Sequence, residues 1–156
     1  MGHSLIVLFK LVLLCVALNL LRYFLFGFLE GVMIMGPLMA AMEQSKTYFN
    51  TDFQTIDWVT SFFYNFVMWF VVTVAFHFSR PHLKGHIVTR SLKVYGLMLI
   101  MFASISAIYM NHYSHPKDFY LYNILDSIIV FPLVGLANAF LYPLFFRQPT
   151  TTDQIR

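Results

Sequence analysis

The chain has 156 residues, of which 59% are hydrophobic and only 11% are charged. A soluble domain usually has about a quarter of its residues charged, so this composition excludes an ordinary water-soluble protein and favours one surrounded by lipid. The net charge is only +3, and the basic residues stand at the ends of apolar runs. That pattern is typical of membrane orientation and argues against a nucleic-acid partner. With Cys15 as its single cysteine, the chain has neither an intrachain disulfide nor a CxxC motif.

The N-terminal third is apolar over residues 4–42 but is interrupted by Lys10, Arg22 and Glu30. A bilayer core of roughly 30 Å is crossed by about 20 apolar residues, so this stretch is too long for one straight crossing. It also lacks a turn signal near Arg22 that would let two crossings fold back on each other.

Glycine and proline come later in this region, in "EGVMIMGP" at residues 30–37. We therefore predict one span over residues 5–29, followed by an irregular or re-entrant piece around Gly31, Gly36 and Pro37. The alternative is an interfacial helix up to residue 22, followed by a span over residues 23–42.

Three further runs are long and apolar enough to cross a bilayer, at residues 58–79, 94–115 and 119–146. We thus predict an all-α integral membrane protein with four transmembrane helices in a small bundle. It forms a single membrane domain over residues 1–148, followed by a polar tail at 149–156.

Charges in the loops predict how the bundle is oriented. The connection between the second and third spans carries four basic residues, Arg80, Lys84, Arg90 and Lys93. Because Lys and Arg resist translocation, this loop is expected to be cytoplasmic, which places both termini in the cytoplasm as well. No targeting signal is recognisable, so we expect a prokaryotic cytoplasmic (inner) membrane.

Ionisable residues within a span are costly in lipid and are therefore candidates for function. Arg22 and Glu30 lie in the first span region, and Asp126 lies in the last span. Arg22 and Glu30 lie near the same face of a straight helix but about 12 Å apart along its axis, so we expect each to face a partner on another helix or subunit. These residues are our candidates for an ion pair or transport site, the alternative being that Arg22 and Glu30 extend to the water interface.

A polar stripe at steps of four residues marks the second span: Ser61, Asn65, Trp69, Thr73 and His77. The stripe winds around the helix, because each step of four gains about 40°. Polar residues of the third and fourth spans can meet it, namely Ser104, Ser106, Asn123 and Asn138. These groups are expected to hold helices together, and a polar pathway is the alternative reading.

Histidines offer a possible metal site in "NHYSHPKD", where His112 and His115 stand close to Asp118. Two imidazoles and a carboxylate can hold a transition metal. No nucleophile elbow, zincin, Walker or dinucleotide-binding motif is present, and no cofactor is expected.

The sequence leads to two main functional hypotheses. One is a non-enzymatic membrane protein that forms homo-oligomers or is a subunit of a larger membrane complex; Gly27 and Gly31 form a GxxxG motif that favours close helix contacts. The other is a small transporter or channel that uses Arg22, Glu30 and Asp126. A metal- or redox-cofactor-binding membrane subunit is a third possibility.

Overall fold

The computed structural model describes residues 2–49, 52–114 and 116–146, in which all regular structure is helical. In chain order, the elements are α1 (Gly2–Leu21), the π-helical turn η1 (Arg22–Phe26), α2 (Gly27–Glu30), a second π-helical turn η2 (Gly31–Met35), α3 (Gly36–Glu43), α4 (Thr55–Ser79), the 3₁₀ turn η3 (Arg80–His82), α5 (Ile87–His112) and α6 (Lys117–Phe145).

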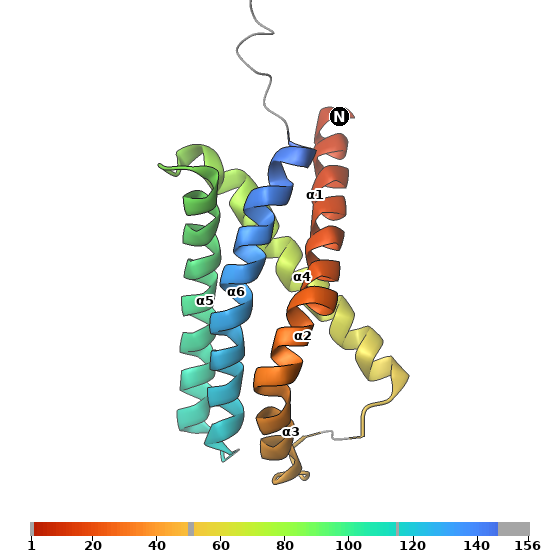
Figure 1. Ribbon diagram of the computed structural model, residues 1–156, viewed down its shortest axis with the longest axis vertical. Coiled ribbons are helices and arrows are strands. Elements are labelled where there is room, and N and C mark those ends of the chain that lie inside the picture. The colour runs from red at the N-terminus through yellow and green to blue at the C-terminus, as the bar shows by residue number, and fades with distance from the viewer. Residues whose placement is uncertain (1, 50–51, 115, 147–156) are drawn as a thin grey trace, which may run out of the picture.

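Four helical units are long and apolar enough to cross a membrane, which confirms the predicted all-α class with four candidate spans. Figure 1 shows that α1 begins, and α6 ends, at the end of the bundle where α4 connects to α5. The end of α3 and the adjoining ends of α5 and α6 lie at the opposite end, and α4 is inclined to the other helices.

The five segments from α1 to α3 follow one another directly and form a helical run over residues 4–43. The prediction of a re-entrant piece is therefore wrong, whereas the predicted irregularity is present as the π-helical turn η2 at Gly31–Met35. The run also continues through the alternative boundary at Arg22. Gly31 (φ −55°, ψ −44°) and Gly36 (φ −59°, ψ −58°) keep right-handed helical angles. Pro37 is tolerated because it lies in the first turn of α3, directly after a π-turn that already interrupts the α-helical hydrogen-bond ladder.

Helix α5 begins at Ile87, earlier than the predicted start of its span at residue 94. The imidazole Nδ1 of His86 accepts a 3.5 Å hydrogen bond from the backbone N–H of Val88 at the start of this helix. Arg90 Nε donates to the carbonyl of Gly85 at 2.7 Å, and Gly85 has a φ of +111°, which favours glycine. Local side-chain contacts thus let α5 start within two residues of this glycine.

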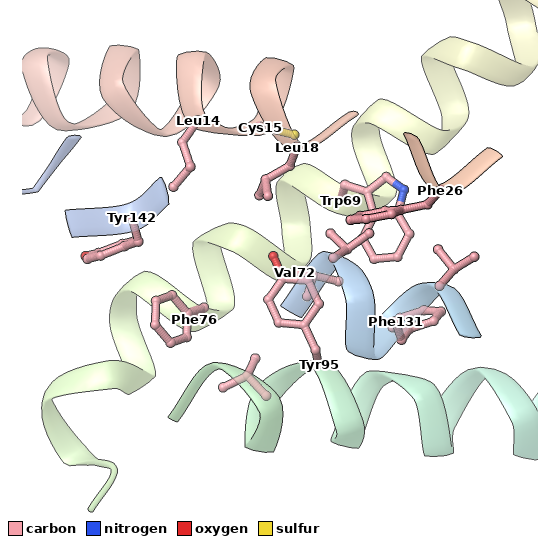
Figure 2. Close-up of a cluster of buried hydrophobic side chains, with 13 residues drawn as sticks. Leu14, Cys15, Leu18, Phe26, Trp69, Val72, Phe76, Tyr95, Phe131 and Tyr142 are labelled. Carbon is pink, nitrogen blue, oxygen red and sulfur yellow. The ribbon is translucent and has the colours of Figure 1, made fainter. Parts of the chain in front are cut away.

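The apolar core lies where α1, α4, α5 and α6 meet (Figure 2). Trp69 packs against Phe131, with ring centroids 4.9 Å apart, and stacks on Tyr95 at 6.2 Å. Helices α5 and α6 approach closely at Gly135, where an added Cβ would lie 3.1 Å from Tyr95. The other labelled core residues are Leu14, Cys15, Leu18, Phe26, Val72, Phe76 and Tyr142.

The outer surface of the helices is apolar. Large hydrophobic side chains are strongly exposed on each long helical unit, for example Phe24, Phe63, Ile100 and Phe140. A surface of this kind suits hydrocarbon and would aggregate in water.

Candidate functional site

The ionisable residues of the spans meet on one side of the bundle. Arg22 Nη1 donates a 2.7 Å hydrogen bond to Glu30 Oε2, and Arg22 Nη2 lies 2.6 Å from Glu30 Oε1. Asp126, from α6, places Oδ2 at 4.0 Å from Arg22 Nη2. The side chains of Arg22, Glu30 and Asp126 are 14%, 7% and 25% exposed, so Asp126 is the most accessible of this charged cluster.

Arg22 and Glu30 can pair because the helix between them is not a regular α-helix. Eight residues of α-helix rotate by about 800°, which is roughly 80° past two full turns. The turn η1 closes hydrogen bonds from residue i to i+5, so it takes up close to one additional residue and removes most of this offset. The π-turn therefore aligns both side chains more closely on one face of the same helical run, and the length of the two side chains spans the axial separation between them.

The expectation that Arg22 and Glu30 would each seek a partner on another helix is thus wrong for Glu30, whose partner lies on its own helical run. That prediction assumed a straight α-helix. The alternative, in which both side chains extend outward to water, does not describe Glu30, whose side chain is 7% exposed and lines the cavity within the bundle.

The charged cluster lies in the wall of a cavity of about 400 Å³ between the inclined helix α4 and the other helices. Its polar wall also includes Asn65 and Tyr64 of α4 and Asn123 and Ser127 of α6. The remaining lining residues are apolar or aromatic: Met35, Leu38, Met68, Trp69, Phe102, Val130 and Phe131. A volume of this size is within the range of small-molecule binding pockets, which are about 300–1,000 Å³.

Three uncharged polar residues of this cavity use their donor groups within their own helices. Asn65 Nδ2 donates to the carbonyl of Ser61 at 2.9 Å, and Asn123 Nδ2 donates to Phe119 at 2.8 Å. Ser127 Oγ donates to Asn123 at 2.7 Å. Each asparagine keeps its carbonyl oxygen and one N–H, and Ser127 keeps its oxygen lone pairs, so these three side chains offer a molecule in the cavity more acceptor lone pairs than donors.

Several buried polar atoms near the charged cluster have no hydrogen-bond partner among the described residues. They are Arg22 Nε, the indole Nε1 of Trp69, and both amide atoms of Asn19, one turn before Arg22. An unpaired buried polar group costs about 1–3 kcal/mol, so these atoms call for water or a ligand.

The polar stripe of α4 divides between different environments, as its predicted winding requires. Ser61 is exposed, Asn65 and Trp69 line the cavity, and Thr73 is buried beyond it. Thr73 Oγ1 donates to the carbonyl of Trp69 at 2.7 Å. His77 Nδ1 lies 2.7 Å from Tyr142 Oη at the end of the bundle where α6 ends.

Only some of the polar residues of α5 and α6 lie beside the polar stripe of α4. Asn123 joins Asn65 at the cavity, whereas Asn138 donates to Ser91 Oγ at 3.0 Å, and Ser91 donates to the carbonyl of Gly135 at 2.7 Å. Ser104 is exposed, and Ser106 is buried. The Ser91–Asn138 pair thus joins α5 to α6 and does not contribute to the cavity.

Sequence reasoning missed the aromatic wall of the cavity, formed by Tyr64, Trp69, Phe102 and Phe131. Aromatic residues make up 19% of the chain, so these four carried no distinguishing signal. The spacing of Trp69 between Asn65 and Thr73 was the one available indication that an aromatic ring lies beside the polar stripe.

The histidine candidate for a metal site is only partly described. His112 is exposed, its Nδ1 lies 3.0 Å from the carbonyl of Ile108, and Asp118 is exposed at the start of α6. His115 lies outside the described residues. Among the residues that are described, no three His, Cys, Asp or Glu side chains are grouped so that they could hold a metal ion.

Comparison with known proteins gives no relative from which a role could be transferred. No family model, curated protein or solved structure matches this chain. Any functional conclusion therefore depends on the charged cluster and its cavity.

Proposed function

We propose that the protein is a small membrane transporter that binds a polar solute in the cavity beside Arg22, Glu30 and Asp126. The observation that carries this proposal is the position of the charged cluster in the wall of a cavity of about 400 Å³. A purely structural ion pair needs no space beside it, and buried charges in a bundle commonly mark a solute or ion pathway.

The arrangement of open and closed regions also supports transport. The cavity adjoins the turns between α1 and α3, while Phe76, Tyr95 and Tyr142 pack densely further along the bundle. With the α4–α5 connection in the cytoplasm of a prokaryotic cell, the cavity would lie in the outer half of the membrane and the packed core in the inner half. A cavity in one half of the membrane and a packed core in the other half is the arrangement expected of a carrier that alternates its access.

The proposal can be tested in proteoliposomes with four labelled solutes of different charge: choline, glycine, succinate and glycerol. We expect uptake of at least one of them, and we expect Glu30→Gln to abolish it, because this change removes the carboxylate that Arg22 holds. Glu43→Gln is the matched control, since Glu43 is exposed at the end of α3 and pairs with Lys46 outside the cavity. Absence of protein-dependent uptake for all four solutes would count against transport. Full uptake by Glu30→Gln would show that Glu30 plays no part in it.

Assembly into a homo-oligomer or a larger membrane complex is the second candidate function. The feature that favours it is Gly31, which is exposed and has no atom within 4 Å of an added Cβ. No helix in the described part of the chain packs closely against Gly31, so this part of the Gly27–Gly31 motif has room for a helix of another chain. Native mass spectrometry after mild extraction tests this candidate, and a monomer that persists across several mild detergents would contradict it.

A further inference from the structure

The charge in the cavity is unbalanced. Of the lining residues, Arg22, Glu30, Tyr64 and Asp126 are charged or titratable, and α5 contributes only the apolar ring of Phe102. One guanidinium against two carboxylates leaves one excess negative charge when all three are ionised. Because an uncompensated charge is costly at membrane depth, the site favours one additional positive charge.

Asp126 is the group best placed to receive that charge. Arg22 approaches Glu30 through two nitrogen–oxygen contacts of 2.7 and 2.6 Å, but its nearest approach to Asp126 is 4.0 Å. Asp126 is also the most exposed member of the charged cluster. Its carboxylate is therefore the least neutralised and the easiest for a ligand to reach.

The rest of the cavity wall also suits a cation. The polar side chains of Asn65, Asn123 and Ser127 donate within their own helices, which leaves their acceptor oxygens for a ligand. Aromatic rings form much of the remaining wall, and the faces of such rings attract ammonium groups. These rings belong to Tyr64, Trp69, Phe102 and Phe131.

A proton can take the place of the cation when the cavity holds no ligand. The carboxyl groups of Glu30 and Asp126 both approach Nη2 of Arg22, at 2.6 and 4.0 Å, so a proton on either of them offsets the excess negative charge of the cluster. With that proton, the charged cluster is neutral.

We propose that the cavity binds a small organic cation of the ammonium class in exchange for one proton carried by the carboxyl pair Glu30 and Asp126. The proton leaves to water as the cation enters, so the cluster is neutral before and after the exchange. This inference rests on the proposed transport function, because it names the class of solute for the same cavity.

The two tryptophans of the chain allow a direct binding measurement. Trp58 is exposed and lies outside the cavity, whereas Trp69 lines it. In a Trp58→Phe background, the fluorescence of Trp69 reports on the cavity in detergent-solubilised protein. Choline is the probe, and two molecules of similar size are its controls: the uncharged alcohol with carbon in place of nitrogen, and the corresponding carboxylate.

We expect saturable fluorescence changes with choline and none with the uncharged alcohol or the carboxylate. In a weakly buffered solution, choline should also release protons, approaching one per chain at saturation. Asp126→Asn should weaken choline binding at least tenfold, and Asp126→Glu should restore part of it. Asp118→Asn, at the exposed start of the same helix, should bind choline as the parent protein does.

Equal binding of choline and the uncharged alcohol would overturn the inference, since charge would then play no part. Saturable binding of the carboxylate alone would overturn it in favour of an anion site at Arg22. Choline binding without proton release would contradict the proposed exchange of the cation for a proton. These comparisons use the Trp58→Phe protein itself, so they stand even if an Asp126 variant fails to fold.

Failure of this inference can be told apart from failure of the proposed function. Uptake of succinate or glycine without choline binding would support transport and contradict a binding site for an organic cation. Saturable choline binding without uptake of any solute would support the cation-binding site and contradict the proposed transport function.

Discussion

Arg22 determines whether the buried carboxylates can be tolerated. Among the described residues that line the cavity it is the one cationic side chain, and both Glu30 and Asp126 lie within 4.0 Å of it. Breaking a buried ion pair by removing one partner costs more than the pair itself contributes, because the remaining charge is left uncompensated.

Replacing Arg22 by Gln should therefore destabilise the protein by about 3–5 kcal/mol, a typical cost for a broken buried pair. Thermal unfolding in detergent, followed by size-exclusion chromatography, measures this loss. The double variant Arg22→Gln/Glu30→Gln should recover a large part of it, because it removes one of the two like charges. Lys46→Gln, in an exposed pair with Glu43, is the control and should change stability by less than about 1 kcal/mol. If Arg22→Gln is as stable as this control, the cluster does not depend on Arg22.

At the scale of the element, the π-turn η1 decides the register between Arg22 and Glu30. A π-turn contains one residue more than the α-turn it replaces, and such turns frequently occur at functional sites. In this chain the additional residue rotates α2 so that Glu30 faces Arg22 and is buried.

Inserting one alanine after Leu25, an exposed residue of η1, should add one residue to the helix between Arg22 and Glu30. Glu30 would then rotate by about 100° away from Arg22, since that is the angle per residue in an α-helix. We expect loss of choline binding in the Trp69 fluorescence assay and a fall in thermal stability similar to that of Arg22→Gln. Leu25→Ala keeps the chain length and is the matched control, expected to bind as the parent does. Unchanged binding after the insertion would show that the register set by the π-turn is not needed.

At the scale of the whole molecule, the orientation of the bundle decides which side of the membrane the cavity faces. The α4–α5 connection and the end of α3 lie at opposite ends of the bundle (Figure 1). The first carries Lys84 among several basic residues, and Lys46 follows the second. The positive-inside rule then predicts opposite exposure for these two lysines.

Single cysteines in a Cys15→Ala background test this orientation in a bacterial host. Lys46→Cys should react with a membrane-impermeant maleimide on intact cells, and Lys84→Cys should react only after the cells are permeabilised. The reverse pattern would invert the proposed topology. Labelling of both positions on intact cells would contradict the assignment of the ends to opposite sides of a membrane. The Cys15→Ala background alone should remain unlabelled.

Composition and apolar run length were sufficient to predict the helical class and the four candidate spans, because hydrocarbon requires long apolar helices that satisfy their own backbone. The identity of Arg22, Glu30 and Asp126 as candidates also followed from the sequence, since charges within apolar runs are conspicuous. The geometry in which these three side chains meet did not follow from the sequence. Which residues a helix brings together depends on local turn type, and nothing in "RYFLF" distinguishes a π-turn from an α-turn before the neighbouring helices pack against it. The inclination of α4 and the aromatic wall of the cavity were likewise decided by tertiary packing, because the same apolar side chains serve equally well against lipid or against protein.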